Sequence, residues 1–438
     1  MRLLIFVPVV CVLGLLAGCT GGGPSAVQRE ILDRAAEAEA AGRVADAIAA
    51  YRRLAEGGVS EAMLRLAALY EEGRGVEADP ATAFAWYRRA AEAGHPRAMR
   101  QLGDRLRDGD GVAADAREAA MWYERAAAAG DLAATGRLGR LLLSGDPAFP
   151  SDPARGFALL EKAATAGDVD AQIALAEALA GEKLAGEKAM LPRPAEARRW
   201  YAIAHTSLER LVEEGDMRAA ETLARLYAEG RGVKPDGARA AELFHVAARG
   251  GRLEALVRLA RLYRDGGPGL AADPVRAIAA FREAASRGHR TAAYELGRLL
   301  LERATSDGAA GPEAAGWLLE AAEAGESRAW FWLGELWGDP GTQPHDPVRA
   351  AEYWEKAGRA GEGKGFFRLG EAARERGELE EAVFWFELAG QSGYERGREL
   401  AARHAARLDA ATRARLADRL KAFVGQGGKV LAVPAPGT

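Results

Sequence analysis

The chain has 438 residues, of which 49% are hydrophobic and 28% are charged, and its formal net charge at pH 7 is −4. The hydrophobic content argues against a disordered chain. The small negative charge lacks the basic excess that a phosphate backbone requires, so no nucleic-acid partner is predicted. Helix-favouring Ala, Leu, Glu and Arg dominate the sequence, and its length suits several domains or a repeat array. We therefore predict an all-α protein.

The first residues predict export and lipidation. Arg2 precedes an apolar stretch at residues 3–16, which is shorter than the roughly 20 residues needed to span a bilayer and fits a signal peptide. The stretch continues into LAGC at 16–19, which resembles the lipobox of bacterial lipoproteins. That resemblance implies cleavage before Cys19 and acylation of its thiol. The alternative is a plain secretory signal peptide with an incidental cysteine.

This interpretation divides the N-terminus into a signal peptide at 1–18 and a lipidated, flexible tether at 19–29. The other cysteine, Cys11, lies inside the signal peptide, so the mature chain would contain no disulfide and no thiolate metal site. The lipobox resemblance also implies sorting to the outer membrane, because Thr20 rather than Asp follows the cysteine. We expect a lipid-anchored protein of the outer membrane that faces the periplasm.

A repeat of about 36 residues fills most of the chain. In nine units a large apolar residue, called the anchor below, is followed by Gly seven positions later, and Tyr201 marks a tenth unit without that Gly. The anchors are Tyr51, Tyr87, Tyr123, Leu160, Tyr201, Phe244, Phe281, Leu318, Trp354 and Phe386. A second motif, Leu followed by Ala or Gly, alternates with the anchors, for example at Leu66 and Leu102. Each unit therefore predicts two helices joined by turns.

A single helix pair cannot bury its own apolar face, so about ten pairs are expected to stack into a right-handed superhelical solenoid. The unit at 62–94 reads AMLRLAALYEEGRGVEADPATAFAWYRRAAEAG. Its pattern resembles the Sel-like repeat family, which is related to tetratricopeptide repeats, and the resemblance covers residues 30–395. It implies a protein-binding adaptor or scaffold, often of the bacterial envelope. Residues 396–424 predict a C-terminal helical cap with a break near Asp409, and 425–438 predict a disordered tail.

Two segments depart from the repeat. Residues 181–194 predict an inserted loop followed by a helix that continues to Gly215, and residues 303–312 are also irregular. Inserts in solenoids often lie on a contact face, although drift in a tolerant loop is the more ordinary explanation.

Other motifs suggest chemistry only weakly. The Gly-x-Gly turns, such as Gly73 to Gly75, lack the strand, Lys and Ser or Thr of a phosphate loop. His95 and His289 share the position after the helix-ending Gly, where other units have Asp, Arg or Glu. We expect this to be a solvated helix start rather than a metal ligand. No metal, cofactor or catalytic residue is predicted.

Trp332 stands where most other units have a polar residue. It precedes Leu333, and the equivalent residues are Arg65, Gln101, Arg137, Ala174, Thr222, Arg258, Glu295 and Arg368. We therefore expect Trp332 to be exposed and to form, with Trp330 and Phe331, an anchor point for a partner protein. The alternative is that the irregular segments cover it. Four other tryptophans occupy regular repeat positions and are expected in the core: Trp86, Trp122, Trp200 and Trp337.

These features together predict a lipid-anchored periplasmic scaffold that binds envelope proteins through its repeat surface. The layout resembles that of lipoproteins of alginate secretion, and this resemblance implies a role in assembly of an alginate-type exopolysaccharide export complex, with an outer-membrane export porin and periplasmic secretion proteins as partners. Two alternatives stay open: a regulator or inhibitor of a periplasmic enzyme such as a cell-wall hydrolase, and an enzyme with an unrecognised site.

Overall fold

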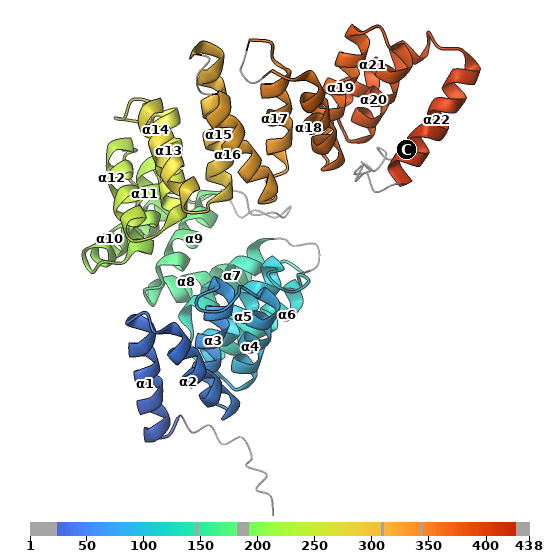
Figure 1. The fold of residues 1–438 in the computed structure, drawn as a ribbon. Coiled ribbons are helices and arrows are strands. Elements are labelled where there is room, and N and C mark those ends of the chain that lie inside the picture. The colour runs from blue at the N-terminus through green and yellow to red at the C-terminus, as the bar shows by residue number, and fades with distance from the viewer. Residues whose placement is uncertain (1–23, 145–148, 182–191, 308–310, 342–344, 426–438) are drawn as a thin grey trace, which may run out of the picture. The chain divides into compact units, whose positions relative to one another are not determined.

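A computed structural model describes residues 24–144, 149–181, 192–307, 311–341 and 345–425 (Figure 1). These residues form 22 helices and no strand, with one isolated bridge between Gly267 and Leu270. The predicted all-α class is confirmed. The predicted signal peptide, Cys19 and the predicted tail after Gly425 lie outside the described residues, as do residues 182–191 of the predicted insert.

The chain divides into two compact units, Met1–Ser207 and Leu208–Thr438. The first unit contains α1 (Ala26–Ala40), α2 (Val44–Glu56), α3 (Ser60–Glu72), α4 (Pro80–Glu92), α5 (Pro96–Asp108), α6 (Ala116–Ala128), α7 (Leu132–Ser144), α8 (Pro153–Thr165) and α9 (Val169–Ala180). Helix α10 (Pro194–Glu213) runs across the division.

The second unit contains α11 (Met217–Glu229), α12 (Gly237–Arg249), α13 (Leu253–Asp265), α14 (Pro274–Ser286), α15 (Arg290–Asp307), α16 (Gly311–Glu323), α17 (Arg328–Gly338) and α18 (Pro347–Arg359). It ends with α19 (Gly363–Glu375), α20 (Leu379–Gln391), α21 (Glu395–Ala405) and α22 (Ala410–Gly425).

Within each unit, helices pack against their neighbours along the chain. Contacts run from α1·α2 through α8·α9 in the first unit and from α11·α12 through α20·α21 in the second. Helices α7 and α9, α15 and α17, and α17 and α19 also touch. Nearest-neighbour packing of this kind defines a solenoid of two-helix repeats, as predicted. The odd-numbered helices α3 to α19 are called A helices below, and the even-numbered helices α2 to α20 are called B helices.

The two sequence motifs supply the core. Each of the ten anchors lies on a B helix and is buried, and the Leu residues of the second motif, such as Leu66 and Leu102, are buried on the A helices. Of the four tryptophans expected in the core, only Trp122 is fully buried, at 3% exposure. Trp86, Trp200 and Trp337 are half-buried against the edges of the hydrophobic clusters.

The small residue after each motif Leu admits the anchor of the same unit. A Cβ added to Gly103 would lie 2.7 Å from Cε1 of Tyr123, and a Cβ on Gly334 would overlap the indole of Trp354. The close approach of A and B helices therefore depends on the absence of a side chain at these positions.

The residues at the helix ends explain where the helices start and stop. Asp79 and Asp273, which precede Pro, accept hydrogen bonds from backbone N–H groups of the first helical turn. Gly73 and Gly75 have φ of 65° and 72°, a backbone conformation that L side chains rarely adopt. The Gly-x-Gly motif is therefore a helix-ending turn.

The apparent loss of a Gly after the anchor Tyr201 reflects a longer helix. Helix α10 has 20 residues and is followed by Gly215 with φ of 89°. Leu208 occupies the position where Gly ends the other B helices, and Gly215 follows seven residues later, which is two helical turns. The predicted continuation of this helix to Gly215 is thus correct.

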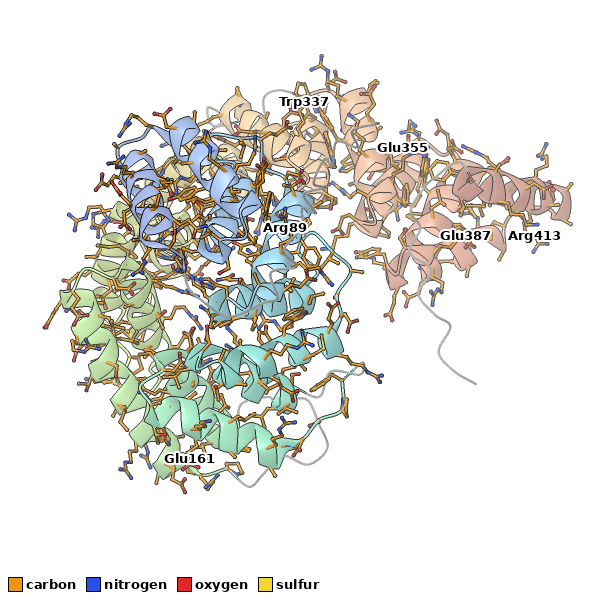
Figure 2. The ribbon with its side chains drawn as sticks, turned by 90° about the horizontal axis from the view of Figure 1, so that it is seen from below. Arg89, Glu161, Trp337, Glu355, Glu387 and Arg413 are labelled. Carbon is orange, nitrogen blue, oxygen red and sulfur yellow. The ribbon has the colours of Figure 1, made fainter. Side chains whose placement is uncertain are left out.

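The chain breaks between α21 and α22 near Asp409, whose carboxylate accepts a hydrogen bond of 2.8 Å from the backbone N–H of Thr412. Phe423 of α22 packs among Phe366, Phe384 and Trp385, with ring centroids 5.6–5.9 Å apart. Exposed charged side chains such as Arg413 point outward from α22 (Figure 2). The helix therefore lays an apolar side on the repeats and a polar side toward solvent.

We predict that Gly334→Ala destabilises the protein by about 1–3 kcal/mol, because the new methyl group displaces the Trp354 ring. The matched control is Gly316→Ala on α16, where an added Cβ meets no atom within 4 Å. Alanine there is expected to be neutral or to stabilise by up to about 1 kcal/mol. The measurement is guanidinium unfolding of each variant; equal effects at both glycines would contradict the packing argument.

Candidate functional site

The A helices expose a polar stripe. Position b is the residue immediately before the motif Leu, and position c is the third residue after position b. Position b is Arg65, Gln101, Arg137, Ala174, Thr222, Arg258, Glu295, Trp332 and Arg368 on successive A helices from α3 to α19. Position c is Ala68, Asp104, Arg140, Glu177, Arg225, Arg261, Arg298, Glu335 and Glu371. All but the buried Ala174 are at least partly exposed, although the side chains of Glu295, Arg137 and Asp104 are only 13%, 16% and 17% exposed.

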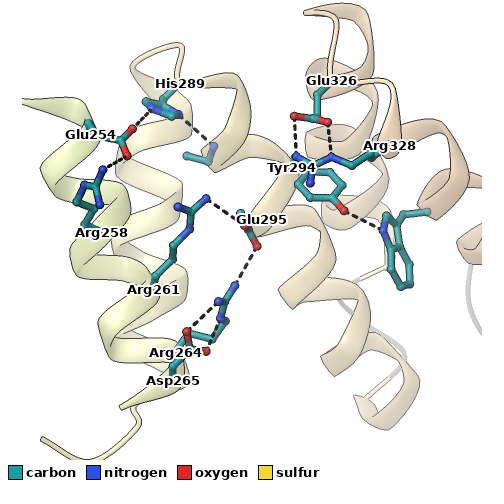
Figure 3. Close-up of polar contacts among 12 residues, drawn as sticks. Glu254, Arg258, Arg261, Arg264, Asp265, His289, Tyr294, Glu295, Glu326 and Arg328 are labelled. Atoms are coloured by element: carbon teal, nitrogen blue, oxygen red, sulfur yellow. Dashed lines mark hydrogen bonds and ion pairs between the residues drawn. The ribbon is translucent and has the colours of Figure 1, made fainter. Parts of the chain in front are cut away.

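At three junctions an ion pair joins position c of one A helix to position b of the next. Asp104 lies 3.4 Å from Arg137, and Glu335 lies 2.7 Å from Arg368. Arg261 lies 3.3 Å from Glu295, which Arg264 also approaches to 3.0 Å (Figure 3). The stripe is therefore paired between neighbouring repeats by charges of opposite sign.

A second kind of contact joins neighbouring repeats at four junctions, between the residue that starts an A helix and a side chain of the preceding A helix. The side chain at the start of α5, His95, faces Glu61 of α3 at 2.9 Å, and Asp131 before α7 accepts a hydrogen bond of 3.1 Å from Arg100 of α5. Arg252 before α13 pairs in the same way with Glu221 of α11. At these junctions the helix-start residue and its partner on the preceding A helix are complementary: an acid faces an arginine, and an arginine or histidine faces a glutamate.

This pairing corrects the expectation of a solvated helix start. The side chains of Asp131, His95 and His289 are only 12%, 19% and 20% exposed. His289 approaches Glu254 to 3.4 Å, and its Nδ1 accepts a hydrogen bond of 3.2 Å from the backbone N–H of Ala292 (Figure 3). At these junctions the helix-start residue is an acid, an arginine or a histidine, and the side chain that it contacts on the preceding A helix differs accordingly.

The His95–Glu61 contact has a defined direction. Nδ1 of His95 accepts from the backbone N–H of Ala98, so Nε2 carries the proton and donates to the Glu61 carboxylate. This hydrogen bond is the largest reason that the pKa of Glu61 lies below its usual range, and Arg65 at 3.0 Å adds to it. Glu61 is thereby held as a carboxylate between two repeats.

The polar groups of several buried anchors donate hydrogen bonds to acids on the preceding helix. Tyr123 donates a hydrogen bond of 2.8 Å to Asp104, and the Trp354 indole donates one of 3.0 Å to Glu335. In the same manner Tyr51 donates to Glu39 at 3.1 Å. Burial, followed by the charge of Glu39, raises the pKa of Tyr51 to about 12. These anchors stay protonated and act as donors at neutral pH.

Asp104 and Glu335 thus make two contacts each. One is to the anchor of their own repeat and one is to the arginine of the next repeat. At Phe244 and Phe281, whose rings have no polar end, position c is the arginine Arg225 or Arg261 instead, whereas the unit of Phe386 has Glu371 there. The c position therefore links the interior of one repeat to the surface of the next.

The three residues predicted as a partner anchor do not form one exposed surface. All three are half-buried. The Trp332 indole donates a hydrogen bond of 3.1 Å to the Tyr294 hydroxyl of α15, and the Arg298 guanidinium lies 5.1 Å from its ring centre. The expectation that Trp332 is exposed is therefore wrong in degree, because a neighbouring repeat covers part of the ring.

Trp330 and Phe331 point elsewhere. Trp330 stacks on Tyr353 of α18 with ring centroids 5.8 Å apart, while Phe331 packs against the C-terminal hydrophobic cluster. Phe331 touches Trp332 edge to face at 5.4 Å. The three rings do not present one continuous apolar face, and their binding role stays a prediction. Trp332 instead fills position b, where its contact with Arg298 replaces an ion pair.

Among the residues that the structure describes, no group of three or more His, Cys, Asp or Glu is placed to hold a metal ion. Within the same residues, no helix combines the length and apolar character needed to cross a membrane.

The fold and the paired stripe define a tetratricopeptide-like repeat protein. The Sel1 repeat model matches seven segments, at residues 60–95, 96–131, 133–168, 218–251, 253–289, 327–362 and 367–394. Because these segments cover more than half of the 438 residues, the chain belongs to the Sel1 repeat family. Such repeats generally mediate protein–protein interaction. The unmatched intervals 169–217 and 290–326 include the two irregular segments, yet both hold helix pairs.

The chain is similar to several solved structures. A protective antigen of uropathogenic Escherichia coli with the SLR fold is 25% identical, with a TM-score of 0.45, 90% of this chain covered and 84% of the other. A Sel1 repeat protein of Oxalobacter formigenes is 27% identical, with a TM-score of 0.41, 58% of this chain covered and 99% of the other. No curated protein matches the chain.

The polar contacts between repeats were not predicted from the sequence. The residue types at position b alone indicate only that this position is polar and exposed. Position c, three residues later, and the charge of the preceding A helix carry the missing signal, since Asp104 and Arg137 or Arg261 and Glu295 are opposite in sign.

We predict that Arg100 and Asp131 couple by about 1–2 kcal/mol in a double-mutant cycle, because their charge-assisted hydrogen bond is largely shielded from solvent. The variants are Arg100→Gln and Asp131→Asn; the latter keeps an oxygen to cap α7. The matched control is the ion pair of Arg210 and Glu214, whose side chains are 64% and 54% exposed. Its coupling is expected to stay below about 0.5 kcal/mol. Guanidinium unfolding provides the free energies, and equal coupling in both cycles would contradict the assignment.

Proposed function

We propose that the chain is a lipid-anchored scaffold of the bacterial envelope that binds other proteins through the stripe of its A helices. The observation that carries the proposal is the recurrence of equivalent, half-exposed polar positions on the A helices from α3 to α19 in the described part of the chain. A surface repeated in this way offers a partner many similar contacts in series. Membership of the Sel1 repeat family supports a protein ligand.

The proposed location is the periplasmic side of the outer membrane. Its support is in the sequence: an apolar stretch at 3–16, the LAGC motif ending in Cys19, and Thr20 after it. The proposed task is assembly of an exopolysaccharide export complex of the alginate type. That part is supported by layout, since a lipobox, about ten repeats and a helical C-terminus together resemble lipoproteins of alginate secretion. The proposed partners are an outer-membrane export porin and periplasmic secretion proteins.

The test combines anchoring and contact mapping in one bacterial host. A photo-cross-linking amino acid replaces Arg218 or Lys364, which are exposed on A helices, or Glu242 or Glu352, which are exposed on B helices. We predict discrete cross-linked products to an envelope protein from the A-helix positions and none from the B-helix positions. A second arm compares the unchanged chain with Cys19→Ala, which is expected to move the protein from the membrane fraction to the soluble periplasmic fraction.

Each arm has an outcome that contradicts its part of the proposal. Equal cross-linking from A and B helices would contradict the assignment of the stripe as the binding surface. An unchanged membrane fraction for Cys19→Ala would remove the lipid anchor. Identification of the cross-linked protein as a cell-wall hydrolase whose activity changes, rather than an export protein, would replace the export role with that of an enzyme regulator.

A further inference from the structure

One neighbouring pair in the stripe has like charges. Position c of α11 is Arg225, and position b of α13 is Arg258. At the equivalent positions elsewhere, Asp104 meets Arg137, Arg261 meets Glu295, Arg298 meets the Trp332 ring and Glu335 meets Arg368. The same register places arginine at both neighbouring stripe positions here, whereas at the three remaining junctions the two positions do not both carry a charge.

Nearby acids compensate the pair only in part. The carboxylate of Glu229 is 3.9 Å from Arg225, but its other oxygen is held by Arg231 at 2.6 Å. The carboxylate of Glu221 is 3.7 Å from Arg258, but Arg252 holds it more closely. Both acids adjacent to the arginine pair are thus engaged by other arginines.

The remaining contact of Arg258 is also shared. Its guanidinium lies 3.4 Å from Glu254, whose other carboxylate oxygen faces His289. In the described residues, neither Nε of Arg225 nor Nε of Arg258 has a hydrogen-bond acceptor, and both atoms are shielded from solvent. The two side chains as a whole are 41% and 37% exposed. A ligand therefore has access to the exposed part of each guanidinium group, and neither arginine faces an acid at the neighbouring stripe position, as Arg137, Arg261 and Arg368 do.

We propose that Arg225 and Arg258 bind a carboxylate of the partner protein, so that an Asp or Glu side chain of the partner completes this stripe pair. The proposal rests on the protein-binding function above and names the chemistry of one contact within it. A carboxylate is favoured because Asp or Glu occupies the equivalent place in the pairs of Arg137, Arg261 and Arg368. An arginine pair also matches the two oxygens of a carboxylate by parallel N–H donation.

The first experiment measures binding of an acidic peptide to the full chain at low salt. The probe is a fluorescein-labelled decapeptide of alternating glutamate and glycine, followed by fluorescence anisotropy. The double variant Arg225→Gln/Arg258→Gln is expected to weaken binding by about tenfold or more. The control Arg239→Gln/Arg282→Gln removes the same charge from B helices, where both arginines pair with acids on B helices, and is expected to change the affinity by less than about twofold.

Two outcomes would overturn the proposal in this experiment. Equal weakening by the control pair would show general attraction to positive charge. Competition by inorganic phosphate at the same concentration as an unlabelled glutamate peptide would show an unselective anion site. Neither outcome affects cross-linking from Arg218 or Lys364 or the behaviour of Cys19→Ala, so failure here is distinguishable from failure of the scaffold function.

The second experiment uses stability and needs no ligand. Arg225→Glu supplies the missing acid from within the chain, so it is expected to raise the melting temperature by about 1–3 °C and to abolish binding of the glutamate peptide. The matched change Arg261→Glu on α13 faces Glu295 and is expected to lower the melting temperature. A similar fall for both variants would show that Arg225 and Arg258 do not face each other and would overturn the site.

Discussion

The structure depends on a single constraint: a pair of short helices has nowhere to bury its apolar faces except against the next pair. The anchors on the B helices and the Leu residues on the A helices are buried, and contacts run from helix to helix along each unit. Stability is then a sum over neighbours. Gly103 and Gly334 follow from the same constraint, because the anchor of each pair must approach the A helix closely.

Hydrophobic stacking alone does not decide which repeat lies next to which, since the apolar positions are nearly the same in every unit. The polar contacts differ from interface to interface. His95 donates to Glu61, whereas Asp131 accepts from Arg100, so exchanging the two helix-start residues would place the acid Asp131 against the acid Glu61. The same contacts leave a half-exposed stripe on the A helices. A partner protein that binds this stripe would therefore contact charged side chains whose signs also have to complement the neighbouring repeat.

The sequence predicts the repeat architecture well because spacing is all that it requires. Anchors about 36 residues apart and Asp-Pro or Gly at the helix ends determine the helix pairs, and even the shifted Gly215 follows from a longer helix. Burial of individual side chains is harder to predict because it depends on the next repeat. Trp332 was expected to be exposed by comparison with polar equivalents, but Tyr294 and Arg298 of the preceding repeat cover part of it. Cys19 and its lipid stay a prediction.

Deletion of one whole repeat tests the neighbour account most directly. Removal of residues 96–131 leaves His95 before α7 and keeps it opposite Glu61, whereas removal of 95–130 places Asp131 opposite Glu61. The two shortened chains differ in this one residue. We predict that both fold cooperatively and lose the helical signal of two helices, by circular dichroism and guanidinium unfolding, and that the chain retaining His95 is the more stable. Loss of cooperative folding in both, or equal stability of the two, would contradict the account.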